Sequence, residues 1–477
     1  MHRKLQISIA QVMAGATLLC LAAIVYGHPF IFHDSGSYYQ YGEHIASELR
    51  ALLQRDNSRI IPLDLVSASY LGARSPSYSL IVFVLVRLAS LWALVAVHAL
   101  VTAWLLLTVT RVVVPTHYYR AYWLLVIIVT LGTSLPYFVA FVMPDLFAAL
   151  GILAVILLLL HDAAMTVTTR CALLLLLAAC ASFHPTLPVV LLGTCLIGTC
   201  LELLFGRPLR RHARSSAGLI IAAIMLGGLS GPAWRVAEHR IFKHDIAAPP
   251  FAMARVLGDG TGFSLLDREC AAQRRFALCN IEMSRPLDSD VFLWGAREEG
   301  GVYKVVDTAM QRRLREEQWR FVAASALHSP GRQFWATTGN IARQLTLVSV
   351  AEPLYDPKTQ TSYHLFNSIG GGIAEESRFA GEPLFHIMRT VVLLASIAGL
   401  GIIVVQAGPG TLRGEAESRY RLAFIAMIGG SIFINAAICG TFSKPWERYQ
   451  ARIIWIIPAS MLLMIMRSRS AGGRRLR

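Results

Sequence analysis

The sequence predicts an all-α polytopic membrane protein, and three observations lead to that prediction. Hydrophobic residues make up 55% of the 477 positions and charged residues only 15%, whereas a soluble domain normally carries about 25% charged residues. Apolar runs of about 20 residues recur along the chain, which is the length that a helix needs to cross a bilayer. The runs are continuous and do not alternate with polar residues, which favours membrane helices over the strands of a β-barrel.

The apolar runs predict a bundle of about ten transmembrane helices with an external insertion. The first run follows basic residues, as in a signal peptide, but it is longer than a signal-peptide core and lacks a small-residue cleavage site, which favours a retained span. The stretch 76–113 is too long for one span, so we expect 76–90 to lie in the outer leaflet as a separate helix. The ten expected spans are 7–27, 91–113, 121–137, 144–161, 170–183, 186–205, 216–233, 384–406, 420–440 and 452–467.

The distribution of charge predicts the orientation of the bundle. The formal net charge is +15, yet residues 233–383 hold 18 basic and 18 acidic residues, so the excess lies in short loops and at the chain ends. Short basic loops stay in the cytoplasm, which predicts cytoplasmic N- and C-termini in a multi-pass protein of the bacterial inner (plasma) membrane. Because these residues are scattered among span ends, the charge does not predict binding to nucleic acid. The excess comes from Arg3, Lys4, Arg111, Arg120, Arg170, Arg207, Arg210, Arg211, Arg214, Arg413, Arg419, Arg421 and the arginines of 467–477.

This topology divides the chain into three parts: an N-terminal transmembrane part, 1–235, with the first periplasmic loop 28–75; a periplasmic segment, 236–383; and a C-terminal transmembrane part with a basic cytoplasmic tail, 384–477. The periplasmic segment holds two of the eight cysteines, Cys270 and Cys279, while the other six lie in expected spans. Two cysteines alone in an outward-facing region predict a disulfide, with a free pair as the alternative.

The stretch 303–328 lies inside the periplasmic segment and has the pattern of an amphipathic helix. Val306, Met310, Leu314 and Phe321 share one helical face, and charged residues occupy most of the other. This pattern predicts a surface helix packed on its own domain. Binding to a phosphate-bearing lipid surface is the alternative.

The first external loop opens with an unusual group of residues. The stretch HPFIFHDSGSYY (28–39) leaves the first span, and its single carboxylate is Asp34. A loop that needed only solubility would be rich in Lys, Glu, Ser and Gly instead of aromatic residues. The neighbours that would share a site with this carboxylate are His33, Tyr38 and Tyr39.

Three further polar residues lie at the mouths of expected spans. Asp145 follows Pro144 at a span start, where a carboxylate stabilises the helix dipole. His184 lies in a tight external connection, and Arg74 precedes a helix that starts with proline. Ionisable groups at membrane depth are costly and are therefore functional candidates. The alternatives are a helix-start carboxylate, a loop histidine and a headgroup anchor, respectively.

The stretch GTFSKPWERYQARIIW (440–455) holds the strongest group of cations. Lys444, Arg448 and Arg452 recur every four residues, which places them on one face of a helix at the outer membrane boundary. Positive charge on the outside runs against the topological bias, so topology does not explain it. Arginine and lysine suit a phosphate or pyrophosphate group. Snorkelling at the membrane interface is the alternative.

Together these stretches resemble the GT-C superfamily of integral membrane glycosyltransferases, which use polyprenyl-phosphate sugars as donors, and are similar to its aminoarabinose transferase and protein mannosyltransferase type. The resemblance covers the transmembrane parts, roughly 1–235 and 384–467, whereas the periplasmic segment is matched by position alone. The stretches that carry it are His33–Tyr39, Arg74–Tyr78, Met143–Asp145 and Arg448–Arg452.

The resemblance implies a periplasmic active site in which Asp34 is the general base that takes the proton of the acceptor hydroxyl. It also implies cations where charge builds on the leaving phosphate. The residues expected to bind the donor phosphate are Arg74, Lys444, Arg448 and Arg452. The residues expected to line the substrate are His33, Tyr38, Tyr39, Asp145 and His184.

The implied partners are a polyprenyl-phosphate sugar donor, a lipid, glycan or protein acceptor, and the surrounding membrane lipids. No cofactor is expected. Some branches of the superfamily bind a divalent cation through acidic residues in these loops. Here the first loop offers a lone Asp34 instead of an adjacent acidic pair, which favours transfer without a metal ion.

Other functions use the same kinds of residue. A transporter or flippase of lipid-linked glycans would hold the phosphate with the same cations, but it predicts inverted repeats, broken helices and charges near the membrane midplane, which the sequence lacks. A glycan polymerase needs outer cations and a carboxylate too. A scaffold whose periplasmic segment binds a partner would make Asp34 dispensable.

Overall fold

The computed structural model describes residues 2–56, 58, 60–61, 71–205, 213–242, 246–272, 275–351, 357–371 and 382–475. Over these ranges the chain is helical and contains no strand, only an isolated bridge between Phe30 and Phe141. The expected all-α class is therefore confirmed. The basic residues Arg207, Arg210 and Arg211, on which part of the orientation argument rests, lie outside the described ranges.

Seven of the described helices are long and apolar enough to cross a membrane. The three other expected spans, 7–27, 121–137 and 170–183, coincide with shorter apolar helices. Every expected span is thus helical, and the number that cross the bilayer stays a prediction. The seven long segments are Leu91–Val113, Leu146–Ala164, Leu187–Leu204, Ser216–Phe242, Glu382–Leu412, Ala416–Phe442 and Glu447–Ser468.

Three of the expected spans are divided in the structure, and one of them, 452–467, is divided at Trp455. The first span is split into α1 and α2, and the span 121–137 ends at Gly132 and is followed by the short helix α8, which has Pro136 in its first turn. Proline lacks an N–H group and starts helices readily, whereas inside a helix it breaks the hydrogen-bond pattern. The N-terminal helices are α1 (His2–Leu19), α2 (Leu21–Tyr26), α3 (His33–Gln54), α5 (Pro76–Leu88), α6 (Leu91–Val113), α7 (Tyr118–Gly132), α8 (Leu135–Ala140), α9 (Leu146–His161), α10 (Val167–Phe183), α11 (Leu187–Phe205) and α12 (Ala213–Ala237).

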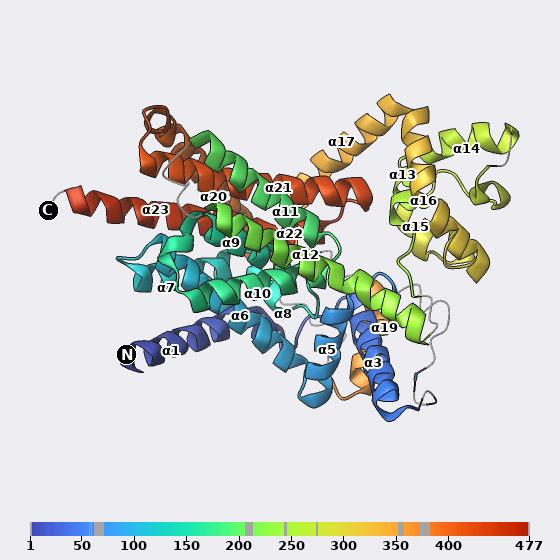
Figure 1. Ribbon diagram of the computed structural model, residues 1–477, viewed down its shortest axis with the longest axis horizontal. Helices are drawn as coiled ribbons and strands as arrows, with labels where there is room; N and C mark the ends of the chain where they lie inside the picture. Colours follow the sequence, from blue (N-terminus) through green and yellow to red (C-terminus); the bar gives the residue numbers. More distant parts are fainter. Residues whose placement is uncertain are drawn as a thin grey trace.

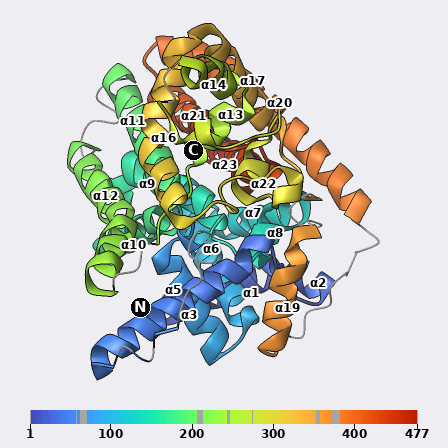
Figure 2. The ribbon, with the colours of Figure 1, turned by 90° about the vertical axis from the view of Figure 1, so that its right-hand side faces the viewer.

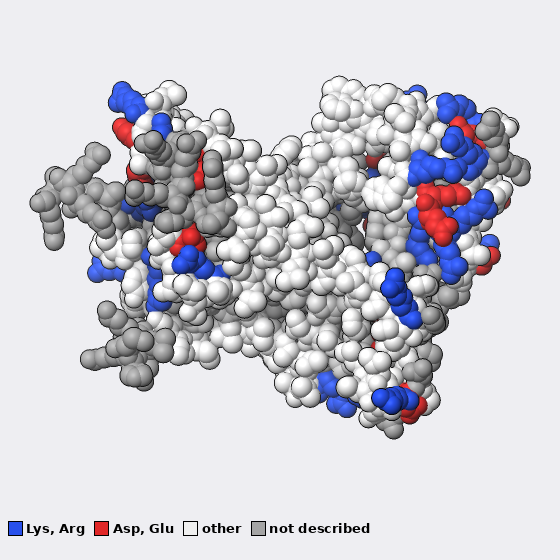
Figure 3. All heavy atoms as spheres, viewed as in Figure 1, with Lys and Arg blue, Asp and Glu red and all other residues white. Residues whose placement is uncertain are grey.

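The two ends of the chain lie at the same end of the helical bundle, and the residues of the inserted segment lie at the other end (Figure 1). On the face drawn in Figure 3, the middle of the molecule is covered by uncharged residues, and lysine, arginine and acidic residues gather at the two ends. Large apolar side chains point outward from the long helices, among them Leu196, Leu226 and Val405. An uncharged belt between two charged ends is the pattern of a protein that lies across a bilayer.

The bridge at Phe30 connects two loops that are far apart in the sequence. The Phe30 N–H donates to the carbonyl of Ala140, and the Val142 N–H donates to the carbonyl of Phe30 (both 2.9 Å). Helix α3 begins three residues after this bridge and α9 begins soon after Val142. The bridge therefore holds the starts of α3 and α9 side by side.

The inserted segment folds around an apolar core of its own, which includes Phe263, Phe292, Leu314 and Phe321. The expected surface helix in 303–328 is present as α16, which begins at Thr308, and Leu314 and Phe321 are buried on its inner face. The helices of this segment are α13 (Phe251–Gly258), α14 (Thr261–Ala272), α15 (Ser289–Trp294), α16 (Thr308–His328), α17 (Pro330–Thr346) and α19 (Gln360–Ser368).

The C-terminal helices close the bundle, with α17 packed along α21 and α20 against α21 and α23. When the molecule is turned by 90°, the inserted segment lies over the end of this bundle (Figure 2). The C-terminal helices are α20 (Glu382–Leu412), α21 (Ala416–Phe442), α22 (Glu447–Ile454) and α23 (Ile456–Arg475).

Cys270 and Cys279 form a disulfide that joins the end of α14 to the core of the inserted segment. The bond closes a loop of only nine residues, for which chain-entropy estimates give about 2–3 kcal/mol. We expect the Cys270→Ser/Cys279→Ser double variant to lose about that much stability, and dithiothreitol to lower the melting temperature of the wild-type protein only. Thermal unfolding of the purified protein measures both effects. An unchanged melting temperature in the double variant would contradict a stabilising bond.

Candidate functional site

Two carboxylates lie at helix starts in the region that the Phe30 bridge organises. Asp34 is in the first turn of α3, and Asp145 immediately precedes α9. Both positions favour negative charge because the N-terminal end of a helix is electropositive. The short helix α22 supplies two arginines, Arg448 and Arg452, which are one turn apart and face the two carboxylates.

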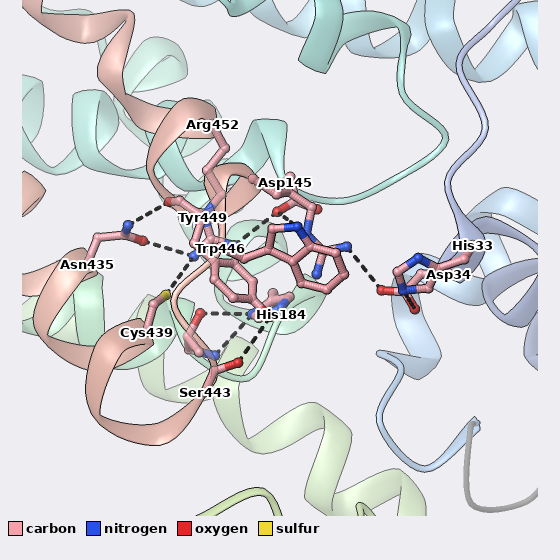
Figure 4. Close-up of polar contacts among 12 residues, drawn as sticks. His33, Asp34, Asp145, His184, Asn435, Cys439, Ser443, Trp446, Tyr449 and Arg452 are labelled. Atoms are coloured by element: carbon pink, nitrogen blue, oxygen red, sulfur yellow. Dashed lines mark hydrogen bonds and ion pairs between the residues drawn. The ribbon is translucent and has the colours of Figure 1, made fainter. Parts of the chain in front are cut away.

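These four residues and Arg74 form a connected network of ion pairs, which we call the arginine–aspartate cluster. Its members Asp34, Asp145 and Arg452 are labelled in Figure 4. Arg448 donates from Nη1 to Asp34 Oδ2 at 3.1 Å, and its Nε lies 3.8 Å from Asp145 Oδ1. Arg452 donates from Nη1 to the same Asp145 oxygen at 3.1 Å. Arg74, which lies just before α5, donates from Nη2 to the other oxygen of Asp34.

The arginine–aspartate cluster is buried and has an excess of positive charge. The side chain of Arg452 is 0% exposed, and even the most accessible member, Arg74, is only 11% exposed. Three guanidinium groups share two carboxylates, which leaves one positive charge uncompensated within the cluster. The Nε atoms of all three arginines are buried and have no hydrogen-bond partner among the described residues. Buried donors of this kind cost free energy unless an acceptor satisfies them.

Aromatic rings surround the arginines. The guanidinium of Arg448 lies 4.6 Å from the ring centre of Phe32 and 5.1 Å from that of Tyr449. The ring of Trp446 is stacked with that of His33 at 5.7 Å. Cation–π contacts stabilise arginines that have left water. They also hold the guanidinium planes in fixed orientations.

A second group of polar residues, on α21 and α17, holds α22 in place. Asn435 of α21 accepts a hydrogen bond from Arg452 Nη2 at 2.9 Å and donates to the carbonyl of Tyr449 at 2.7 Å. The fully buried Gln344 of α17 donates to the carbonyl of Trp446 and accepts from its N–H, both at 2.9 Å. The inserted segment thus contributes directly to the position of Trp446.

The pKa of Asp34 follows from these contacts. Burial alone would raise it, but Arg74, His33 and Arg448 outweigh burial and hold the pKa well below its usual range. A depressed carboxylate pKa stabilises the fold above the unfolded-state value, and this contribution is lost as the pH falls through the folded-state value. Asp34 is therefore ionised throughout the neutral range, and its contribution to stability does not change there.

His184, labelled in Figure 4, lies between α10 and α11 at the edge of the arginine–aspartate cluster, near the charges of Arg452 and Asp145. Its Nδ1 lies 2.8 Å from the hydroxyl of Thr186. Burial and the nearby charge of Arg452 lower its pKa to about 3. His184 is therefore a neutral ring at physiological pH.

Lys444 does not share a helical face with Arg448 and Arg452, so that prediction is wrong. Helix α22 begins only at Glu447, and Pro445 in the preceding residues favours an extended chain before it. The ammonium group of Lys444 instead lies 3.1 Å from Asp288 of the inserted segment. Lys444 is an ion-pair partner of that segment in this structure.

Tyr38 and Tyr39, which were expected to line one site, diverge. The ring of Tyr38 faces the guanidinium of Arg74 at 5.5 Å. The ring of Tyr39 packs against Phe83 and Phe366 instead. Successive residues on a helix are about 100° apart, so only Tyr38 shares the side of α3 that carries Asp34. The structure therefore leaves Tyr39 outside the arginine–aspartate cluster.

Four residues that support the arginine–aspartate cluster were not among the sequence-based candidates: Gln344, Asn435, Trp446 and Tyr449. Asn435 is an amide within an expected apolar span, 420–440, and that signal alone marks it as a candidate. Trp446 and Tyr449 lie beside the arginines in the sequence. Gln344 carries no local signal, because its role depends on a contact with Trp446, 102 residues away.

No family model, curated protein sequence or solved structure matches the chain. Among the described residues, no group of three or more His, Cys, Asp and Glu side chains is arranged to hold a metal ion. The metal-independent chemistry expected from the lone Asp34 stays a prediction.

The two hydrogen bonds of Gln344 predict a large effect from a nearly isosteric substitution. In Gln344→Leu both backbone groups of Trp446 lose their partner, and each unsatisfied buried group costs about 1–3 kcal/mol. We expect the melting temperature to fall, and the Trp446 ring to become mobile. Gln54→Leu, at an exposed position of α3, is the matched control. Equal melting temperatures of the two variants would show that Gln344 does not hold Trp446.

Proposed function

We propose that the protein is a membrane glycosyltransferase of the GT-C type, which moves a sugar from a polyprenyl-phosphate donor to a lipid, glycan or protein acceptor on the periplasmic side of the bacterial inner membrane. One observation carries the proposal: three buried arginines share only two carboxylates, and all three keep an N–H group without an acceptor. A buried excess of positive charge with unused donors suits an anionic ligand such as phosphate.

Arg74 and Arg448 are the arginines that would bind the donor phosphate. Both contact Asp34, and both remain slightly exposed, whereas Arg452 is fully buried between Asp145 and Asn435. In this proposal Arg452 and Asp145 keep α22 against α9 and so orient Arg448. Lys444 forms an ion pair with Asp288. In this proposal it positions its loop and does not bind the phosphate.

The transfer step uses Asp34 as the general base. The acceptor hydroxyl oxygen attacks the anomeric carbon of the donor and forms the new glycosidic bond, while the bond between that carbon and the phosphate oxygen breaks. The phosphate leaves with the bonding electron pair, which Arg74 and Arg448 stabilise. The acceptor proton passes to the Asp34 carboxylate.

The ion pairs of Asp34 explain why the donor would bind before the acceptor reacts. While Arg74 and Arg448 hold it, Asp34 has a depressed pKa and accepts a proton poorly. A donor phosphate competes for the same two guanidinium groups. As the arginines turn to the phosphate, the carboxylate loses two positive neighbours, and its pKa rises towards the ordinary value. Donor binding would thus prepare the base before the acceptor reacts.

An apolar groove offers room for the donor chain. It has a volume of about 460 Å³ and lies between α11 and α21. One wall reaches Val189, close in sequence to His184, and the other reaches Phe442, close to Lys444. A hydrocarbon chain in this groove would lead from the bilayer to the level of the arginines.

The test compares four strains by mass spectrometry of extracted glycolipids and lipid-linked sugars: a deletion, and the deletion complemented with wild type, Asp34→Asn or Glu43→Gln at equal protein levels. Glu43, which is only partly buried on the same helix, is the matched control. We expect the deletion and Asp34→Asn strains to accumulate a polyprenyl-phosphate sugar and to lose one glycan mass. Removal of a general base lowers turnover by about 10²–10⁴-fold. A wild-type profile in the Asp34→Asn strain would contradict the proposal and favour a transporter.

The Arg448→Lys substitution tests whether Arg448 binds the donor phosphate. Lysine keeps the charge but loses the planar, two-pronged donor set, so we expect the KM for the donor to rise about tenfold, equivalent to about 1.4 kcal/mol. Arg313→Lys, at an exposed position of α16, is the matched control. Initial rates in liposomes, measured against donor concentration, give the KM of each variant. An unchanged KM in Arg448→Lys would remove Arg448 from the phosphate site.

A further inference from the structure

Helix α17 of the inserted segment turns three amide side chains to the protein and its two aromatic residues, Phe334 and Trp335, to the outside. Gln333, Asn340 and Gln344 lie along one face and make inward contacts. Phe334 and Trp335 are 62% and 72% exposed. A helix on the surface of a soluble domain has the opposite arrangement, with its apolar side buried.

The inward contacts fix this orientation. Gln333 accepts a hydrogen bond from Thr261 at 2.6 Å, and Asn340 donates to Asp259 at 2.9 Å. Asn340 also lies against Gly440 of α21, where a Cβ atom would approach its carbonyl to 3.0 Å. The helix cannot turn its aromatic residues inward without breaking these contacts, so their exposure is a property of the fold.

The level of α17 along the bundle is set by its contact with α21. Gly440 is near the outer end of this apolar span, so Asn340 lies close to the outer membrane boundary. Trp335 precedes Asn340 by five residues in α17, a distance of about 8 Å at 1.5 Å per residue. The headgroup layer of a bilayer is about 5–8 Å thick on each side. Trp335 therefore lies within the depth of the outer headgroup layer, and Phe334, one residue earlier, lies at its outer edge.

A second exposed tryptophan lies close to the end of α21. Trp319 of α16 is 61% exposed, and its ring is 6.3 Å from that of Phe442, the last residue of α21. Leu327, at the end of α16 next to α17, is 82% exposed. Tryptophan is enriched where protein meets the membrane interface, because its ring is apolar and its N–H is polar.

The charge of α17 also favours contact with the membrane interface. Helix α17 carries Arg332 and Arg343, both exposed, and no acidic residue. In Figure 3 uncharged atoms cover the region of α17, while the charged residues of the inserted segment gather further from the bundle. An interfacial helix typically combines aromatic residues that enter the lipid with basic residues that contact lipid phosphates.

We propose that α17 is an interfacial anchor, which seats the inserted segment on the outer leaflet. Phe334 and Trp335 contact the phospholipid layer, and the arginines of the helix contact lipid phosphates. The occupant of this surface is phospholipid, and the inference does not depend on Asp34 or on any donor. Because Gln344 lies on the same helix, the anchor also fixes the height of the loop that carries Trp446.

The test measures which tryptophans contact lipid. The full-length protein is placed in nanodiscs with and without phospholipids brominated on their acyl chains, and the bromine-dependent quenching of emission is compared among single Trp→Phe variants. Trp92, exposed on the apolar helix α6, is the positive control, and Trp294, packed with Phe251 inside the inserted segment, is the negative control. We expect Trp335→Phe and Trp92→Phe to remove a quenched contribution, and Trp294→Phe to remove none.

The alternatives give different results. If Trp335→Phe behaves like Trp294→Phe, the aromatic side of α17 is outside the lipid and the proposal fails. If that result comes with two copies of the chain in each nanodisc, the surface is a contact between copies. Near-wild-type melting temperatures in the Trp→Phe variants establish that each comparison is made on folded protein.

Discussion

The sharing of two carboxylates among three buried arginines is the interaction around which the end of the bundle next to the inserted segment is arranged. Asp34 and Asp145 come from helix starts that the Phe30 bridge holds together, and Arg448 connects them. Breaking a buried ion pair by removal of one partner costs several kcal/mol, because the other charge stays buried. The arrangement is therefore stable only as a whole. Its remaining positive charge is what makes it suitable for an anion.

The inserted segment and the bundle depend on each other through the loop between α21 and α22. Lys444 of this loop pairs with Asp288, and Gln344 holds the backbone of Trp446. Trp446 in turn stacks on His33, next to Asp34. A helix seated on the membrane surface thus acts on the same loop as the ion pairs do. The position of the arginine–aspartate cluster relative to the bilayer follows from both.

The sequence predicted those features that depend on local chemistry. Apolar runs predict the helical spans, because a chain in lipid must satisfy its backbone internally. The aromatic neighbours of Asp34, the position of Asp145 at a span start and the spacing of Arg448 and Arg452 mark these residues as candidates. Features that depend on exact helix boundaries were missed. Lys444 does not lie on the predicted helical face, because Pro445 precedes α22 and the helix begins only at Glu447. The hydrogen bonds by which Gln344 holds Trp446 require a contact between distant segments. No local pattern contains that information.

The most direct measurement is the binding of a polyprenyl phosphate, compared with the corresponding polyprenol, by native mass spectrometry of the purified protein. The account predicts that only the phosphate binds specifically, and that Arg448→Met abolishes the difference while Arg313→Met at the exposed position preserves it. Equal binding of the alcohol and the phosphate, or full phosphate binding by Arg448→Met, would contradict the claim that the buried arginines form an anion site.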